Sequence, residues 1–271
     1  MLRTDLNQIK EIALQDKISN SFFINRLQEL ETLPWSLQNE ITVFESKNEI
    51  KSAIYNGANL VPLATNDESR VAFAQYLLET PRRASSIVGI KYEVLGIWDL
   101  LKPFWPKPRE IRETQPLLFA DDEPILAPDP LVRPALIREL DILLPACVSM
   151  FTEEVGVSPV VGSSEQSYRN RIADLINHRR IFTRIDNGQV TFKAEIGVQT
   201  QWVSQIQGVW VPPQLRGRNF GKAGMAATLS LTRKYFSPIT SLYVNDYNHR
   251  AQAVYKSVGF QEHSTFATVL F

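Results

Sequence analysis

The sequence has very little cysteine and histidine. Its 271 residues include one cysteine, Cys147, and three histidines, His178, His249 and His263. A single cysteine excludes an intrachain disulfide and a cluster of thiolate ligands, and the three histidines show no metal-ligand spacing. We therefore expect a cytoplasmic protein that binds no metal.

Long apolar runs and an excess of one charge are also lacking. No window approaches the roughly 18 apolar residues that read as a membrane-spanning helix, and residues 1–17 mix charged with apolar residues, unlike a signal peptide. The 29 basic residues balance the 29 acidic ones. Zero net charge argues against a general binder of nucleic acid or of membrane surfaces. We expect a soluble globular protein, since 44% of the residues are hydrophobic.

One stretch divides the chain. Residues 120–134 contain four prolines and four acids, which disfavour helix and most sheet pairing. We predict a domain at 1–122, a linker at 123–135 and a second domain at 136–271; a long surface loop within one domain is the alternative. The second part carries more Lys and Arg than Asp and Glu, which suits an anionic ligand. No fixed-period repeat is visible.

The first part has α/β patterning and no recognisable catalytic spacing. A helical pattern at 8–31 breaks near Ser19–Ser21, and Asp67 or Ser69 is expected to cap a later helix. The remaining expected elements are strands at 41–45, 50–63, 85–89 and 115–120 and a helix at 92–101.

The sequence pattern of the second part predicts a helix pair, a mostly antiparallel sheet and one βαβα segment. A glycine follows the first helix, and an Asp-Asn-Gly turn joins two β-rich runs at 181–197. The expected helices are 137–155, with Pro145 kinking or dividing it, 164–180, 221–235 and 249–258; further strands are expected at 202–211, 241–245 and 265–271.

The segment 209–227 has the pattern of an anion site. A strand ends at Val211, two prolines turn the chain out of the sheet, and a loop with two glycines leads into a helix. Such a loop exposes backbone N–H groups, and the helix start adds unpaired donors and a positive dipole end. A pyrophosphate would match this arrangement. Three basic residues add charge to it, Arg216, Arg218 and Lys222.

A second pattern follows in 248–260. Asn248 precedes a predicted helix and can cap it. Ala251 and Tyr255 lie four residues apart, hence on one face of that helix. Gly259 ends the helix and Phe260 returns the chain to the core. Taken alone, Tyr255 reads as a half-buried helix tyrosine.

Together the two patterns resemble the motifs of the GNAT superfamily of acyl-CoA-dependent N-acetyltransferases. One departure is Asn219, which stands where the family usually has glycine. Among non-glycine residues, asparagine tolerates left-handed backbone angles best, so the shape of the loop can be kept. The resemblance extends over nearly the whole chain, to a bacterial two-domain group whose smaller N-terminal α/β domain is itself GNAT-like. It implies that acetyl-CoA is held by Val209, Trp210, Val211, Arg216, Gly217, Arg218, Asn219, Phe220, Gly221, Lys222, Asn248 and Tyr255.

The resemblance also implies direct attack of an amine on the thioester, with Tyr255 as the general acid for the departing thiolate. Glu195 is our candidate general base; an ion pair with Lys193 or an arginine is the alternative reading. His263, Asp246 and water remain alternatives for the base. Cys147 is expected to be a core residue.

We therefore expect an acetyl-CoA-dependent N-acetyltransferase of the GNAT fold, a mixed, mostly antiparallel sheet flanked by helices. The acceptor would be a primary amine of a small molecule or protein, without nucleic acid or membrane partners. A weakly catalytic acyl-CoA sensor and the transfer of another acyl group are the alternatives. The sequence does not indicate the acceptor or the oligomeric state.

Overall fold

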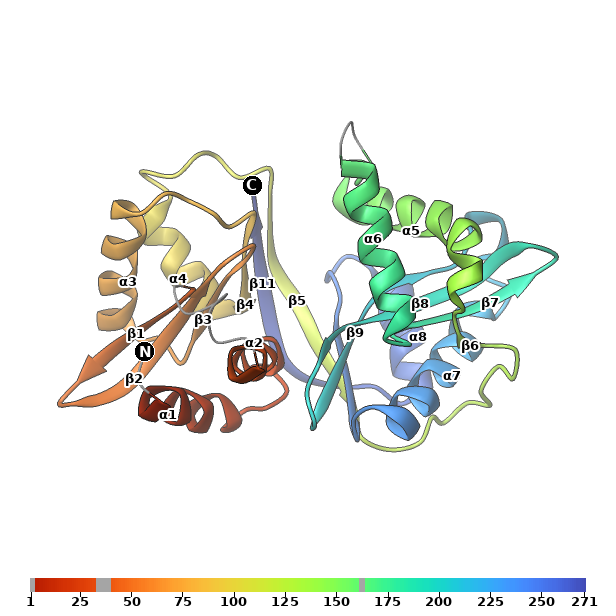
Figure 1. Cartoon of the computed structure of the whole chain (residues 1–271), viewed down its shortest axis with the longest axis horizontal. Coiled ribbons are helices and arrows are strands. Elements are labelled where there is room, and N and C mark those ends of the chain that lie inside the picture. The colour runs from red at the N-terminus through yellow and green to blue at the C-terminus, as the bar shows by residue number, and fades with distance from the viewer. Residues whose placement is uncertain (1–2, 33–39, 161–163) are drawn as a thin grey trace. The chain divides into compact units, whose positions relative to one another are not determined.

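A computed structural model describes residues 3–32, 40–160 and 164–271 (Figure 1). The chain forms two compact units. The first contains residues 1–118, 243–248 and 262–271, and the second contains 119–242 and 249–261. No helix in the described ranges is long and apolar enough to cross a membrane.

The first unit is a sheet with helices on it. Its strands follow the order β1-β2-β3-β4-β11-β5. The pairs β1–β2, β2–β3 and β4–β11 are antiparallel, whereas β3 and β4 are parallel. The elements are α1 (Arg3–Leu14), α2 (Ser21–Thr32), β1 (Ile41–Ser46), β2 (Glu49–Asn56), β3 (Leu60–Leu63), α3 (Asp67–Glu79), β4 (Ser86–Ile90), α4 (Lys91–Leu101), β5 (Glu110–Ala120) and β11 (Gln261–Leu270).

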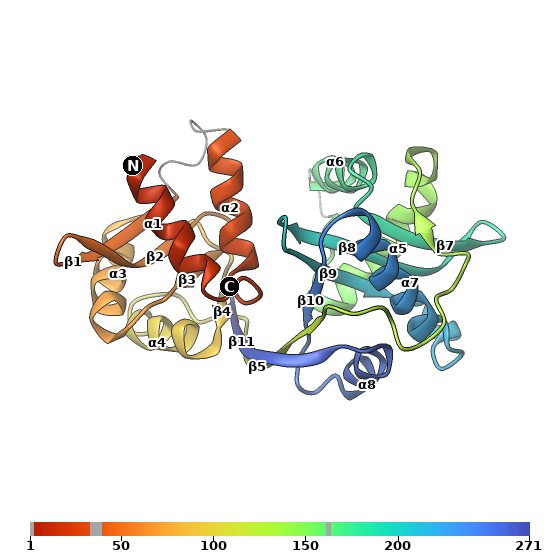
Figure 2. The same cartoon turned by 90° about the horizontal axis from the view of Figure 1, so that it is seen from below.

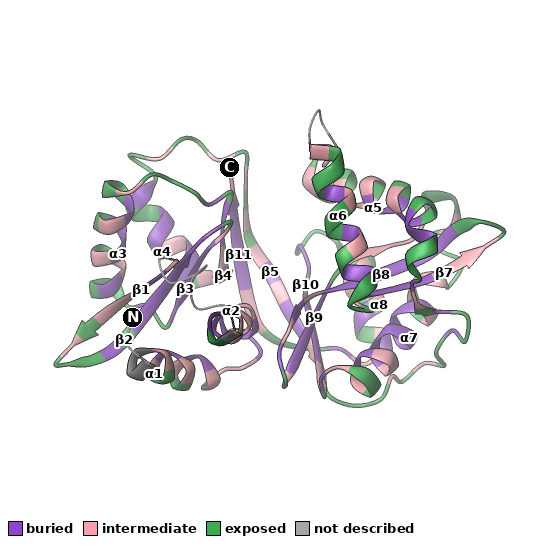
Figure 3. Cartoon of the chain, in the orientation of Figure 1, coloured by how far each residue is buried: buried purple, intermediate pink, exposed green. Residues whose placement is uncertain are grey.

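The core of the first unit lies between its sheet and the helices α3 and α4. Phe73 and Leu77 of α3 and Ile97 of α4 are buried there, and buried residues line the strands in Figure 3. Ala267 and Val269 of the last strand belong to the same cluster. The C-terminal strand, which we predicted within 136–271, is therefore part of the first unit.

The second unit has strand order β10-β9-β8-β7-β6. The strands β6 to β9 pair antiparallel, and β10 runs parallel to β9. Its elements are β6 (Arg133–Pro134), a 3-10 turn (Ile137–Glu139), α5 (Leu140–Val155), α6 (Ser164–Asn177), β7 (Ile181–Asp186), β8 (Gln189–Gln199), β9 (Val203–Trp210), a second 3-10 turn (Pro213–Leu215), α7 (Phe220–Tyr235), β10 (Ile239–Tyr243) and α8 (His249–Val258).

Helices α5 and α6 pack on the sheet of this unit, and α7 packs against α8 (Figure 2). Leu143 and Cys147 of α5 and Ile172 of α6 are buried with Ile181 of β7. The core position expected for Cys147 is confirmed, and burial raises the pKa of its thiol. Pro145 lies within the continuous helix α5 rather than dividing it. Gly156 ends that helix in the left-handed conformation (φ 78°), as the sequence predicted.

The predicted linker does not stand apart from the second unit. Ile125 donates its backbone N–H to the carbonyl of Val258, and Asp129 donates to the carbonyl of Ala223. The Asp129 carboxylate also pairs with Arg184 at 2.9 Å, and β6 pairs with β7. These bonds attach the proline-rich segment to the second unit, whose boundary lies at 119 rather than 136.

The two halves of the chain repeat one order of elements. Chain order gives two helices, three antiparallel strands, a helix, a parallel strand, a helix and a last strand, first as α1 to β5 and again as α5 to β11, with β6 and the short turns as additions. The sequence shows no repeat of fixed period. The repetition is therefore one of topology, since a fold is specified by pattern more than by residue identity.

Candidate functional site

The loop between β9 and α7 has the geometry that the sequence predicted for an anion site. A short turn at Pro213–Leu215 leads to Gly217 (φ 80°) and Asn219 (φ 69°), both left-handed. A Cβ added at Gly217 would meet nothing within 4 Å, so the backbone there faces open space. Asn219 takes up the conformation for which asparagine is suited, so its presence preserves the loop.

Helix α7 begins directly after this loop with free donor capacity. Its N-cap, Asn219, makes no side-chain cap hydrogen bond. The first N–H groups of an α-helix have no acceptor within the helix. Donors and the positive end of the helix dipole therefore meet at Phe220, Gly221 and Lys222. The Arg184 guanidinium stacks 4.9 Å from the centre of the Phe220 ring, with its charge already paired with Asp129 and Asp186.

Strands β9 and β10 diverge beside the loop. They pair only from Val203 to Gln205 on β9 and from Ile239 to Ser241 on β10. Beyond Gln205 the β9 backbone continues to Trp210 along β8 alone. The edge of β9 that includes Val209 and Trp210 therefore has backbone groups available to an extended ligand.

A β-bulge shapes this edge. Lys193 of β8 pairs with Trp210 and Glu195 pairs with Gln207, so β9 has one extra residue between the two pairs. Gly208 has φ 59° there. A bulge leaves one residue outside the regular ladder and re-aims its neighbours. The sequence prediction that Val209–Val211 supply backbone donors thus falls on an irregular strand segment.

The end of α5 brings three predicted residues together. The Glu153 carboxylate accepts from the Arg216 guanidinium at 2.6 Å and from the Trp210 indole N–H at 3.4 Å. The adjacent Glu154 acts electrostatically on Tyr255. Arg216 also donates to the Val211 carbonyl at 3.0 Å. The strand end, the loop and the α8 tyrosine therefore converge on one region of the second unit.

Tyr255 is 8% exposed, with its ring 6.0 Å from that of Phe260. Burial, with a smaller contribution from Glu154, raises the pKa of the Tyr255 hydroxyl well above its usual value. The hydroxyl therefore holds its proton at neutral pH, as a proton donor must, but it is a weaker acid than a free tyrosine. Phe260 is 3% exposed and packs in the core, as expected. Asn248 immediately precedes α8, and its backbone N–H donates to the Asn245 carbonyl.

Glu195 takes part in an ion pair, which the sequence analysis gave as the alternative to its role as general base. It is 1% exposed, and its carboxylate accepts from Gln207 Nε2 at 2.9 Å, Arg171 at 3.2 Å and Lys193 Nζ at 3.4 Å. Burial opposes the charged form, but Lys193, Arg171 and the Gln207 hydrogen bond together hold the pKa of Glu195 below its usual value. These contacts reduce its basicity; its role as general base stays a prediction.

The alternative bases His263 and Asp246 are grouped with the first unit. His263 Nε2 contacts the Asp16 carboxylate of the same unit at 2.9 Å. Sequence reasoning missed Glu153, whose only signal was its place at a helix end, and Arg171, whose link to Glu195 crosses 24 positions of sequence.

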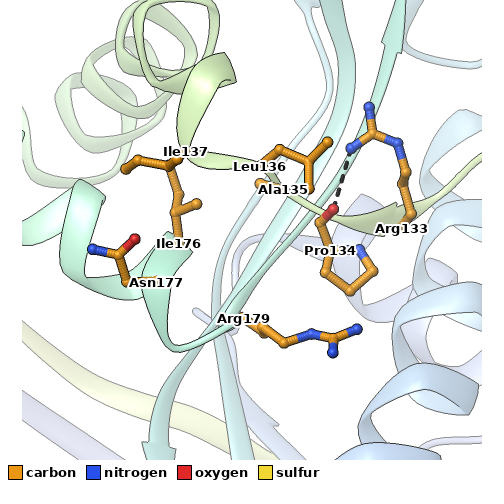
Figure 4. A pocket seen from close by; sticks show the side chains of 8 residues that line it. All are labelled: Arg133, Pro134, Ala135, Leu136, Ile137, Ile176, Asn177 and Arg179. Carbon is orange, nitrogen blue, oxygen red and sulfur yellow. Dashed lines mark hydrogen bonds between the residues drawn. The ribbon is translucent and has the colours of Figure 1, made fainter.

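A pocket elsewhere in the second unit contains none of the predicted residues. Figure 4 shows its lining at β6 and the end of α6, where Arg133 donates to the Pro134 carbonyl at 3.1 Å. Arg133 is also paired with Glu139 at 2.5 Å, and the Arg179 guanidinium stacks on Tyr235. The charge of Arg133 is therefore balanced by a carboxylate, whereas stacking leaves the charge of Arg179 in place.

Comparison with known protein families identifies two parts of the chain. Residues 149–260 match the model described as the acetyltransferase (GNAT) family, and residues 39–143 match a domain of unknown function (DUF4081). No curated protein matched the sequence.

Solved structures share the fold at low sequence identity. A Drosophila protein aligns over 100% of this chain and 97% of its own with TM-score 0.67 and 12% identity. A GCN5-related N-acetyltransferase from Sphaerobacter thermophilus aligns over 99% and 92% with TM-score 0.60 and 14% identity. A tandem GNAT protein from the clavulanic acid biosynthesis pathway aligns over 98% and 95% with TM-score 0.55 and 12% identity.

The chain has the GNAT acetyltransferase fold, and the solved structures that share this fold align with nearly all of the chain. The chain contains a GNAT acetyltransferase domain at 149–260 and an N-terminal domain of the DUF4081 type at 39–143. The GNAT domain supports acyl transfer in general and leaves the donor, the acceptor and the site residues to be argued from the structure.

Proposed function

We propose that this protein transfers an acetyl group from acetyl-CoA to a primary amine of a small molecule or a protein, by direct attack of the amine on the thioester. The observation that carries the proposal is the left-handed loop at Gly217 and Asn219, which leads into an α7 start without a side-chain cap. Donors in this arrangement suit a pyrophosphate.

The residues of the second unit fit such a donor substrate. Arg216, Arg218 and Lys222 would surround the phosphates, and the open β9 edge at Val209–Val211 would bind the acyl carbonyl or the amide groups of the pantetheine arm. Acetyl-CoA supplies the activated acyl carbon. The Arg216–Glu153 pair holds the guanidinium at the loop before any ligand arrives, so less side-chain freedom is lost on binding.

Tyr255 is the proposed general acid. A buried hydroxyl with a raised pKa remains protonated through the neutral range, and its proton would neutralise the departing thiolate. For proton removal from the amine we favour water. Glu195 already accepts from three donors, and a carboxylate with a lowered pKa is a poor base near neutral pH.

The proposal is tested by incubating the full chain with acetyl-CoA and a panel of small amines and peptides. We expect release of free thiol and a mass gain of one acetyl group on some acceptor. Tyr255→Phe should lower kcat by about 100-fold or more, as for loss of a general acid. Tyr168→Phe is a matched control, because Tyr168 is also 8% exposed and loses only a hydrogen bond to the Cys147 carbonyl.

Two results would contradict the proposal. The first is tight CoA binding with no transfer to any acceptor, which corresponds to the sensor alternative; no finding supports that alternative at present. The second is equal loss of activity in Tyr255→Phe and Tyr168→Phe, which would remove Tyr255 from the chemistry.

A further inference from the structure

Lys193 is a charged residue in the core of the second unit. It is 0% exposed, and its ammonium donates to the Gly208 carbonyl at 2.9 Å and lies 3.4 Å from a Glu195 oxygen. A buried ammonium is costly unless it is paired and hydrogen-bonded. Both conditions are met here, and the acceptor is the backbone of the β9 bulge.

The bulge lies close against the Lys193–Glu195 pair. Lys193 and Glu195 are two residues apart on β8, so their side chains point to the same face of the sheet. A Cβ on Gly208 would lie 3.0 Å from Glu195 Cγ and from Met150 Cε, which is closer than side chains normally approach. Gly208 also has φ 59°. The backbone therefore approaches the Lys193–Glu195 pair through a residue without a side chain.

Holding the Gly208 carbonyl also orients the next N–H group. The Gly208–Val209 peptide is trans, because no cis peptide bond occurs in the described residues. In a trans peptide the C=O and N–H bonds lie in one plane and point in opposite directions. Because the carbonyl points at the Lys193 ammonium, the Val209 N–H must point away from it. A charged donor on the carbonyl also polarises the peptide and strengthens its N–H as a donor.

We propose that Lys193, whose charge is balanced by Glu195, is a positioning residue for acyl transfer: it fixes and polarises the Gly208–Val209 peptide so that the Val209 N–H stabilises the acyl oxygen. This inference rests on the proposed function, because it assigns a role to one backbone donor of that site. It also gives the Glu195 carboxylate a purpose other than proton removal.

The main variant is Lys193→Met combined with Glu195→Gln. Removing both charges avoids leaving a buried carboxylate unpaired, while Arg171 has 44% of its side chain in contact with solvent and can be hydrated. The matched control is Thr183→Val. Thr183 is also 0% exposed and donates to a strand carbonyl of the same sheet, that of Phe192 at 3.0 Å, but not to the bulge.

We expect kcat to fall by about 10- to 100-fold in the double variant, up to the loss seen on removing a preorganised oxyanion donor. The Kd for CoA, measured by calorimetry, should change by less than about 3-fold, because the phosphate loop is untouched. Thr183→Val should leave both quantities near those of the unaltered protein. Unchanged kcat, or a loss of CoA affinity that matches the loss of kcat, would overturn the proposal.

A second measurement needs no acceptor. With 15N-valine labelling, the Val209 amide resonance of the full chain can be assigned through Val209→Ile and followed on adding acetyl-CoA or CoA. We expect acetyl-CoA to shift this resonance more than CoA does, since only acetyl-CoA has an acyl oxygen, and the double variant to lose the difference. If acetyl-CoA binds and Val209 responds equally to both, the inference fails and the proposed function stands. If acetyl-CoA does not bind, the proposed function fails.

Discussion

The two units build the same strand–helix junction for opposite purposes. In the first unit β3 ends at Leu63 and α3 begins at Asp67, and the Asn66 side chain caps the helix by accepting from the Ser69 N–H. In the second unit β9 ends at Trp210, and a longer loop leads to an α7 start without a side-chain cap. The start of α3 is capped by a side chain, while the start of α7 leaves its donors available to the proposed ligand.

Charge separates the junctions further. Asp67 and Glu68 lie in the first turn of α3, whereas basic residues surround the start of α7. In the first unit the buried Glu93 carboxylate accepts from the Thr65 N–H at 2.6 Å, directly after β3. A carboxylate of the protein thus occupies a donor at the strand end. One topology can thus satisfy the donors of a helix start or leave them available, depending on a few residues at the junction.

The largest expected effect concerns Glu93, which lies beside the connection between β3 and the capped start of α3. Burial raises its pKa from 4.5 to about 7, so between those values the folded chain keeps a proton that the unfolded chain has released. The free energy of unfolding should therefore decrease as pH rises from about 4.5 to about 7, by on the order of 3 kcal/mol. Denaturation at several pH values, with Glu93→Gln expected to flatten the profile, measures this effect.

Glu195 supplies the opposite case. Its pKa is lowered in the folded chain, so its contribution to stability is present above the unfolded value and is lost as pH falls below it.

If Glu93→Gln left the loss of stability between pH 4.5 and 7 in place, Glu93 would not be the group that responds.

The next effect tests the charge around the uncapped start of α7. Arg218→Glu with Lys222→Glu gives α7 acids at its start, as α3 has. We expect the Kd for CoA to rise by roughly 30- to 100-fold, since each change replaces attraction to phosphate by repulsion. Lys234→Glu with Lys256→Glu changes the net charge equally at the last turns of α7 and α8. Comparable weakening in that control would show that net charge alone is responsible.

A smaller effect tests the shape of the loop. Asn219→Val places a β-branched residue at φ 69°, a conformation that costs such residues about 1–2 kcal/mol. The Kd for CoA should rise by about 5- to 30-fold as that strain opens the loop. Asn219→Gly is the matched control and should bind at least as tightly as the natural sequence. Equal binding by the valine and glycine variants would mean that the left-handed residue does not shape the site.

The smallest effect concerns the cap of the first unit. Asn66→Ala removes the acceptor for the Ser69 N–H and should reduce stability by about 1 kcal/mol, the usual value for an N-cap. It should leave the Kd for CoA unchanged, because that junction is not proposed to bind CoA. Any weakening of CoA binding would place a ligand at the first junction and break the comparison.

Much of the second unit was predictable because its signals are local. Helix α8 has the predicted bounds, 249–258, and the Asn187-Gly188 turn has the two positive φ angles that a tight hairpin needs. Helix α3 was predicted less well. Its cap is Asn66 rather than Asp67 or Ser69. Several polar residues in succession leave the position of a cap ambiguous.

The sequence by itself determined where the candidate site is placed, because Gly217, Asn219, the two arginines before α7 and Lys222 in its first turn act over neighbouring residues. Only the tertiary structure decided which unit holds β11 and which partners surround Glu195. Both depend on pairing between distant segments: β11 with β4, and Glu195 with Arg171 on another element. No local pattern encodes such pairings, since they arise when strands and helices pack and exclude water from a shared core.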